Sequence, residues 1–154
     1  MARSDVETVE RKIASPPEAI FALLSDARRH RDIDGSGTVV DATGESEPLA
    51  LGSVFGMSMH LGIRYTTANT VTEFKPDRRI AWQTRPTAFY GRFTGGRTWR
   101  YELEPIDGGT IVRESWDIST EAPLSRPLVR RAAKVTRRNM EQTLERIDKL
   151  VTSA

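Results

Sequence analysis

The sequence predicts an α+β protein in which a curved antiparallel sheet of about seven strands wraps around one long C-terminal helix. Residues 127–151 repeat apolar side chains at helical spacing, and residues 38–118 alternate apolar and polar side chains in successive short runs. Gly, Pro and Asp separate these runs closely enough for hairpins, which join antiparallel strands. Twenty-five helical residues extend about 37 Å. A sheet with one apolar face covers such a helix most simply by curving around it.

The first elements are a strand over residues 6–14 and a helix that starts in Ser15-Pro-Pro-Glu18. Ser15 is the predicted N-cap, and Glu18 stands three residues later, as in a capping box. The helix has its apolar side chains between Ala19 and Leu24, and the glycines in Gly35-Ser-Gly37 end the segment.

The middle of the chain predicts six further strands, over residues 38–45, 54–61, 65–74, 80–84, 97–103 and 110–118. The clearest alternation is in residues 54–61, where large apolar groups occupy every second position. Pro105 to Gly109 is the predicted hairpin turn before the last strand. Pro86 to Gly96 is irregular and contains three aromatic residues, which either cover a pocket as a lid or close the edge of the core.

The C-terminal helix carries polar residues in the middle of its apolar face. Ser125 is its predicted N-cap and Pro127 fits its first turn. Thr136, Asn139 and Thr143 fall within about 60° of one another on this face. Either each bonds locally to its own helix or a strand carbonyl, or the three border a hydrated or ligand-filled cavity. The helix alone leaves both interpretations open.

Composition limits the classes of function. The 154 residues are expected to form one domain, residues 1–154, with 38% hydrophobic and 29% charged residues. Without an apolar run near 18 residues or a signal-peptide pattern, we expect no transmembrane segment and a cytoplasmic location. The chain has no cysteine and two histidines, so we expect no disulfide, metal or cofactor. The net charge is only +2, and the basic run from Arg126 to Arg138 lacks aromatic residues, which argues against nucleic-acid binding. That run is either a solvated face or a contact for an anionic surface or partner.

Five stretches together resemble one family. They are Ser15-Pro-Pro-Glu-Ala-Ile-Phe-Ala-Leu-Leu-Ser-Asp26, Thr70-Val-Thr-Glu-Phe-Lys-Pro-Asp-Arg-Arg-Ile-Ala-Trp82, Trp99-Arg-Tyr-Glu-Leu-Glu-Pro105, Asp107-Gly-Gly-Thr-Ile-Val-Arg-Glu-Ser-Trp116 and the terminal helix. In order and spacing they resemble the helix-grip superfamily (START-related, SRPBCC), and most of all its polyketide cyclase/dehydrase and lipid-transfer-like branch. The resemblance implies a helix-grip fold with an apolar cavity between sheet and helix. Relatives often carry tryptophan after the first helix, where this chain has His30-Arg31-Asp32.

The resemblance brings no shared catalytic motif, so no catalytic residue is carried over. We expect a small-molecule binding protein for a lipid, polyketide or aromatic ligand, as a monomer or homodimer. The alternatives are a polyketide cyclase/dehydratase-type enzyme acting in the same cavity and a protein-interaction module. The candidate ligand-binding residues share an inward phase or lie in the aromatic connection: Met57, Met59, Tyr65, Trp82, Phe89, Tyr90, Trp99, Tyr101, Glu114, Trp116, Thr136, Asn139, Met140 and Thr143.

Three of the inward residues are candidate proton donors or acceptors: Glu114, Arg97 and Tyr65. A buried carboxylate must be paired or protonated, and Arg97 has the right phase on the neighbouring strand. The sequence therefore predicts a cross-strand ion pair between Glu114 and Arg97, unless a bulge turns Glu114 out to solvent or Arg97 lies beyond the sheet.

Overall fold

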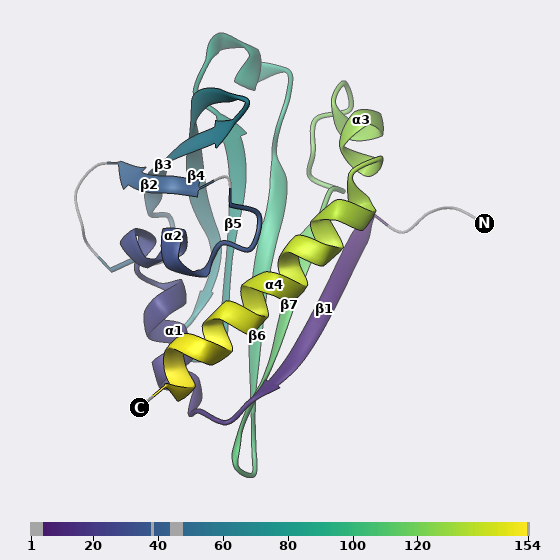
Figure 1. Cartoon of the computed structure of the whole chain (residues 1–154). Coiled ribbons are helices and arrows are strands. Elements are labelled where there is room, and N and C mark those ends of the chain that lie inside the picture. Colours follow the sequence, from purple (N-terminus) through teal and green to yellow (C-terminus); the bar gives the residue numbers. More distant parts are fainter. Residues whose placement is uncertain (1–4, 38, 44–47, 154) are drawn as a thin grey trace.

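A computed structural model describes residues 5–37, 39–43 and 48–153 of the chain (Figure 1). Within these residues, seven strands form one antiparallel sheet in the order β1-β7-β6-β5-β4-β3-β2. The strands are β1 (Val6–Ile13), β2 (Val39–Thr43), β3 (Val54–Leu61), β4 (Ile63–Lys75), β5 (Arg79–Pro86), β6 (Arg97–Ile106) and β7 (Gly109–Asp117). The helices are α1 (Pro17–Leu24), η1 (Ala27–Arg29), α2 (His30–Ile33), η2 (Phe89–Arg92), α3 (Arg126–Arg130) and α4 (Ala133–Thr152). The predicted α+β class, with a curved sheet and a long C-terminal helix, is confirmed.

The sheet is a run of hairpins from β2 to β7, and β1 then adds to its free edge. β1 pairs antiparallel with β7, from Val6 opposite Asp117 to Ile13 opposite Thr110. The β6–β7 turn is shorter than predicted, because β6 extends to Ile106 and only Asp107 and Gly108 connect the strands. Gly108 has φ +82°, which a glycine adopts without strain. This turn fixes the register of β6 against β7.

The start of α1 differs from the prediction. Its N-cap is Pro16, and Ser15 makes no cap. The Ser15 carbonyl instead accepts a hydrogen bond of 2.8 Å from the Thr110 hydroxyl of β7. Two successive prolines already fix φ near the helical value and leave few free N–H groups to cap, which removes the need for the predicted capping box.

The predicted single helix over residues 127–151 is two helices, α3 and α4, separated by Arg131 and Ala132. Backbone bonds from Arg131 N to Leu128 O (3.2 Å) and from Ala132 N to Val129 O (2.9 Å) tighten the chain there. Leu128, one of the apolar residues in the predicted repeat over residues 127–151, lies before this turn and is exposed. Ser125 stands at the N-cap position of α3, but its side chain does not cap the helix.

α4 lies across the sheet and packs mainly on β1, with smaller contacts to β7 and with α1 and α2 against its flank (Figure 1). Met140, Leu144 and Ile147 of α4 are buried. The core that they join includes Ile13, Ile20, Leu24, Val71, Ile80, Leu103, Val112 and Trp116. None of the helices described is long and apolar enough to cross a membrane.

The connection after α2 approaches α4 closely at Gly35. A Cβ atom on Gly35 would lie 2.2 Å from the Asn139 carbonyl oxygen and 2.6 Å from the Thr143 nitrogen. The Gly35 N–H donates to Thr143 Oγ1 over 2.9 Å. Glycine is therefore required here for the backbone of the connection to rest on the helix.

Candidate functional site

A buried tyrosine and a buried glutamate face each other on the inner side of the sheet. Tyr101 of β6 is the cross-strand partner of Glu114 of β7. The Tyr101 hydroxyl donates a hydrogen bond of 2.7 Å to Glu114 Oε1. Both side chains point inward because they share the strand phase of Leu103 and Val112, which are also buried.

Within the described part of the chain, one carboxyl oxygen of Glu114 has no hydrogen-bond partner. The side chain is only 2% exposed, and Oε2 makes no hydrogen bond to any described residue. The pKa of Glu114 is raised to about 8, and burial is the largest cause. The hydrogen bond from Tyr101 acts to lower this pKa, and the charge of Asp34 acts to raise it. At pH 7 the group is therefore mainly the neutral acid, whose O–H is available to donate a hydrogen bond.

Tyr101 joins the glutamate to a group of aromatic rings. The Tyr101 and Trp82 ring centroids are 5.7 Å apart. His30 stacks on Trp82 with a centroid distance of 4.8 Å and an interplanar angle of 21°. Phe55 meets both rings edge-on, at 5.4 Å from His30 and 5.6 Å from Trp82. Such offset and edge-on arrangements are favourable for aromatic pairs.

His30 is a site residue that sequence reasoning missed. Its Nε2 lies 2.9 Å from the Leu24 carbonyl oxygen, and burial lowers the pKa of the ring. Because a carbonyl only accepts, Nε2 carries the proton in the neutral ring and Nδ1 is an acceptor. The one available signal was its position after the first helix, where the resemblance implied a tryptophan.

A row of three tryptophans crosses the neighbouring strands. Trp82 of β5 is opposite Trp99 of β6, and Trp99 is opposite Trp116 of β7. These are all the tryptophans of the chain. Trp82 and Trp116 are buried and Trp99 is half-buried. The row lies beside the Tyr101–Glu114 pair, so tryptophan fluorescence reports on this part of the sheet.

A second cluster of polar side chains lies on β4 and β5. The Asn69 side-chain amide donates to the Phe55 carbonyl and to Thr67 Oγ1, both at 3.2 Å. Thr84 Oγ1 donates to Asn69 Oδ1 over 2.7 Å. These groups satisfy one another, in contrast to Glu114 Oε2.

Thr136, Asn139 and Thr143 of α4 were expected either to bond locally or to border a cavity, and the structure separates them. Thr143 is buried and fully bonded, because its hydroxyl accepts from Gly35 N and donates to the Asn139 carbonyl over 3.0 Å. The local interpretation therefore describes Thr143. Thr136 and Asn139 are half-buried, and the Asn139 side chain makes no hydrogen bond to the residues described.

The predicted ion pair between Glu114 and Arg97 is not formed. Arg97 Nε lies 3.1 Å from Oε1 of Glu121, a residue that the sequence analysis did not single out. The register places Thr98 opposite Asp117 and Tyr101 opposite Glu114, so Arg97 lies beyond the end of β7. The predicted turn of five residues left this register open, and the two-residue turn decides it.

Glu121 is a connecting residue between the irregular segment and the start of α3. Its carboxylate accepts from Gly95 N (3.0 Å), from Arg97 N (3.1 Å) and from the Ser125 hydroxyl. It is 1% exposed and satisfied by these donors.

Burial, the largest effect, raises the pKa of Tyr65, and the charge of Arg97 lowers it. The candidate acids and bases Tyr65 and Glu114 therefore lie in different surroundings.

The other predicted site residues fall into three groups. Met57 and Met140 are buried, and Met59, Tyr65 and Trp99 are half-buried. Tyr90 is exposed, and the side chain of Phe89 lies outside the part of the chain that the structure describes. Asp34, which the sequence analysis missed, acts through its charge on His30, Tyr65, Tyr101 and Glu114.

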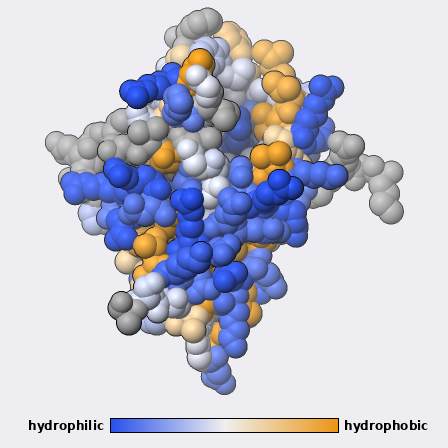
Figure 2. All heavy atoms as spheres, in the orientation of Figure 1, coloured by the Kyte–Doolittle hydropathy of each residue, from blue (hydrophilic) through white to orange (hydrophobic). Residues whose placement is uncertain are grey.

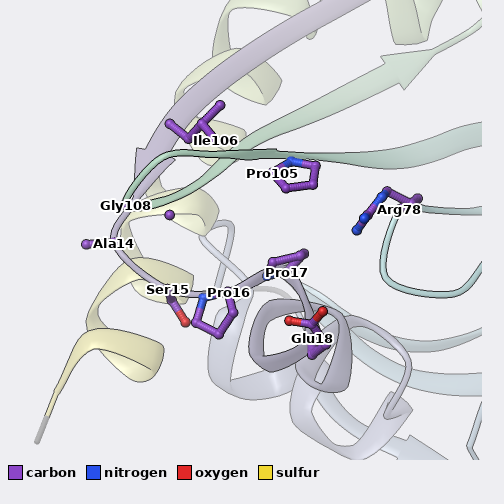
Figure 3. A pocket seen from close by; sticks show the side chains of 10 residues that line it. Ala14, Ser15, Pro16, Pro17, Glu18, Arg78, Pro105, Ile106 and Gly108 are labelled. Carbon is purple, nitrogen blue, oxygen red and sulfur yellow. The ribbon is translucent and has the colours of Figure 1, made fainter.

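A shallow groove of about 490 Å³ lies at another place, between the start of α1 and the β6–β7 turn (Figure 3). Its walls are Pro16, Pro17, Pro105 and the turn glycines, with Glu18 and Arg78 as its charged residues. None of the predicted site residues lines it. No group of three or more His, Asp or Glu among the described residues is arranged to hold a metal ion.

Comparison with known proteins agrees with this fold. The family described as "Polyketide cyclase / dehydrase and lipid transport" matches residues 6–152. The uncharacterized protein Rv0088 of Mycobacterium tuberculosis is 35% identical over 108 residues, which are 69% of this chain and 44% of that protein. The chain thus spans less than half the length of the curated relatives it matches.

Solved structures with the same fold share little sequence with the chain. Protein MLL2253 of Mesorhizobium loti has a TM-score of 0.70 at 19% identity, over 94% of this chain and 95% of that one. Protein CV1439 of Chromobacterium violaceum has a TM-score of 0.73 at 15% identity, over 97% and 99%. DynU16, a protein in the dynemicin biosynthetic locus, has a TM-score of 0.68 at 12% identity, over 98% of this chain and 48% of that one.

Proposed function

Because the chain belongs to the polyketide cyclase/dehydrase and lipid transport family, we propose that it binds a small apolar or aromatic molecule. The ligand lies on the inner face of the sheet beneath α4, against the row of Trp82, Trp99 and Trp116. Ligand sites in proteins are mostly apolar with a few placed polar groups. Glu114 and Tyr101 are the polar anchor of this site.

The observation that carries the proposal is Oε2 of Glu114, which has no hydrogen-bond partner among the residues that the structure describes. A buried polar group without a hydrogen bond costs about 1–3 kcal/mol, so a ligand that bonds to this oxygen recovers that free energy. With a pKa of about 8, Glu114 is mainly neutral at pH 7 and offers a donor. The favoured ligand is therefore a neutral molecule with an acceptor oxygen, such as an aromatic ketone or a phenol.

The test is a titration of tryptophan fluorescence with 1-acetonaphthone and 2-naphthol at pH 6 and pH 9. Wild type should bind more weakly at pH 9, because the ionised carboxylate no longer donates to the ligand oxygen. Glu114→Gln keeps an N–H donor at both pH values and should bind equally at both. Glu114→Leu removes the donor and should weaken binding by about tenfold, the equivalent of one hydrogen bond.

Glu141→Gln, on the exposed side of α4, is the matched control and should behave as wild type. Mass spectrometry of the solvent extract of freshly purified protein complements the titration. If neither probe changes the fluorescence and the extract holds no small molecule, the binding function is wrong.

A second candidate function is catalysis at the same place, as in a polyketide cyclase or dehydratase. The observation that favours it is the raised pKa of Glu114, since a group that titrates near neutral pH serves as a general acid or base. Glu114 would protonate a ligand carbonyl and Tyr101 would hold the resulting carboxylate. Turnover of a poly-β-ketone mimic that Glu114→Gln abolishes while binding remains would support catalysis.

A further inference from the structure

The segment from Ala122 to Met140 has an unusual charge balance. It contains six basic residues and no acidic residue, whereas the whole chain carries a net charge of only +2. The remainder of the chain is therefore net acidic. The segment comprises the turn that precedes α3, α3 itself, the turn at Arg131 and Ala132, and the first part of α4.

Half of these basic residues are engaged with the protein itself. Arg126 donates to the Ser119 and Glu121 carbonyls, Arg130 pairs with Asp5 at 2.7 Å, and Arg137 pairs with Glu7 at 3.3 Å. The other three, Arg131, Lys134 and Arg138, are exposed. They form no ion pair with the carboxylates that the structure describes.

Large apolar side chains lie on the same segment and are exposed to solvent. Leu124 is 74% exposed, Leu128 is 70% exposed and Val135 is 60% exposed. Leu124 lies two residues before α3, Leu128 lies on α3 and Val135 lies in the first turn of α4. Figure 2 shows apolar surface at the corner of the molecule where Figure 1 places α3.

The irregular segment before β6 adds a further apolar side chain. Phe93 is 59% exposed. Its neighbour Gly95 is held to the start of α3, because Ala122 N donates to the Gly95 carbonyl over 2.8 Å and Gly95 N donates to the Glu121 carboxylate. These bonds hold Gly95, two residues after Phe93, to the residues that lead into α3.

We propose that the apolar-basic ridge, formed by Phe93, Leu124, Leu128 and Val135 with Arg131, Lys134 and Arg138, docks on an anionic lipid bilayer. Interfacial segments combine leucine and phenylalanine side chains, which enter the boundary of the acyl chains, with basic residues, which meet the headgroups. Each basic residue near an anionic membrane strengthens binding about fivefold. Apolar side chains exposed together are otherwise unfavourable in water.

The shape of the ridge favours a bilayer over a protein or nucleic acid. α3 projects from the corner of the sheet (Figure 1). A projecting helix enters a soft interface, whereas a stable protein partner needs a complementary surface of about 800 Å² on each side. Phe93 is the single aromatic side chain among the residues of the ridge. The ridge therefore lacks the row of aromatic rings on which successive nucleic-acid bases stack.

The experiment is flotation of the full chain with vesicles of phosphatidylcholine, alone or with about one third phosphatidylglycerol, at 50 and 500 mM NaCl. Wild type should float with the anionic vesicles at low salt and much less with the neutral vesicles. Leu124→Ser with Leu128→Ser, and Arg131→Gln with Lys134→Gln and Arg138→Gln, should each lower the partition coefficient at least tenfold. All of the replaced residues are exposed, so the circular dichroism melting curves should stay unchanged.

Matched controls come from other faces of the protein. Leu51→Ser with Val54→Ser replaces two apolar residues of 67% and 66% exposure, and Lys12→Gln with Arg64→Gln and Lys75→Gln replaces three exposed basic residues. Both should bind as wild type. If the ridge variants float as well as wild type, the proposal is wrong. It is also wrong if light scattering shows a dimer that the ridge variants dissociate while flotation is absent, because the ridge is then a contact between copies. The flotation result does not depend on whether the protein binds 1-acetonaphthone, so the two proposals can fail separately.

Discussion

At the residue scale, burial and the hydrogen bond from Tyr101 have opposite effects on the ionisation of Glu114. Burial disfavours the carboxylate, and the Tyr101 hydroxyl, at 2.7 Å, favours it. Tyr101→Phe removes this donor and should raise the pKa of Glu114 above about 8. A carbon-detected NMR titration of the Glu114 carboxyl measures the change.

Arg97→Ala is the control for this titration. Arg97 is engaged with Glu121, so its removal should leave the pKa of Glu114 nearly unchanged. A fall in the pKa of Glu114 in Tyr101→Phe would contradict the hydrogen bond.

At the residue scale, period-two alternation predicted the inward face but not the partners on it. Glu114 points inward as predicted, because its neighbours Val112 and Trp116 are buried on the same side. The partner of Glu114 depends on the register, which the length of the β6–β7 turn sets. His30 and Asp34 were missed because they lie in a short irregular region where no periodicity marks a face.

The contact between the α2–β2 connection and α4 depends on one glycine and one hydroxyl. Gly35→Ala places a Cβ against the backbone of α4 and should lower the free energy of unfolding by about 1–3 kcal/mol. Thr143→Val leaves the buried Gly35 N–H without an acceptor and should cost a similar amount, about 1–3 kcal/mol. Urea denaturation followed by circular dichroism measures both.

Thr143→Ser keeps the hydroxyl and should cost much less than Thr143→Val, although it loses a methyl group. Equal losses for the two variants would mean that packing, and not the hydrogen bond to Gly35, is what Thr143 supplies.

Glu121 ties the segment before β6 to the start of α3. Glu121→Ala leaves the N–H groups of Gly95 and Arg97 without their acceptor and should cost about 3 kcal/mol. Glu141→Ala breaks an exposed pair with Arg137 on α4 and should change stability by less than about 0.5 kcal/mol. Thermal unfolding compares the two, and equal melting temperatures would refute the role of Glu121.

At the element scale, the strands were largely predictable and the C-terminal helix only in part. The strand over residues 54–61 has the predicted bounds. The break at Arg131 and Ala132 has no proline or glycine to announce it. Contacts distant in sequence accompany it, since Arg130 pairs with Asp5 and Arg137 donates to the Thr8 carbonyl, on either side of the turn. A helical wheel contains no such information.

The stability of the whole molecule should depend on pH through Glu114. Its pKa is about 8 in the folded protein against 4.5 without the fold, so folding stabilises the protonated acid. The stabilisation is complete below about pH 4.5 and is lost as pH rises towards 8, at about 1.4 kcal/mol per pH unit. The difference in unfolding free energy between wild type and Glu114→Gln should therefore shift against wild type from pH 5 to pH 8.

Chemical denaturation at pH 5, 6.5 and 8 measures this difference, and other titrating groups cancel between the two proteins. A constant difference over this range would mean that Glu114 is ionised in the folded protein. Glu141→Gln, an exposed change on α4, is measured as the control.

The class of the whole molecule was predictable because hairpin signals and one long amphipathic helix leave few arrangements. The pairing of β1 with β7, which closes the sheet, could not be predicted. Nothing local in residues 6–13 indicates that β1 pairs with β7 and contacts α4.

This closing pair has a consequence for synthesis on the ribosome. Ninety-five residues separate Ile13 from Gly109, the first residue of β7. At roughly 5–20 residues per second, β1 emerges on the order of 5–20 s before its partner strand exists. During that time Val9 and Ile13, which are buried in the finished sheet, stay in water. The nascent chain thus presents an amphipathic strand that a chaperone can hold until β7 and α4 arrive, and slower translation of the last third lengthens that exposure.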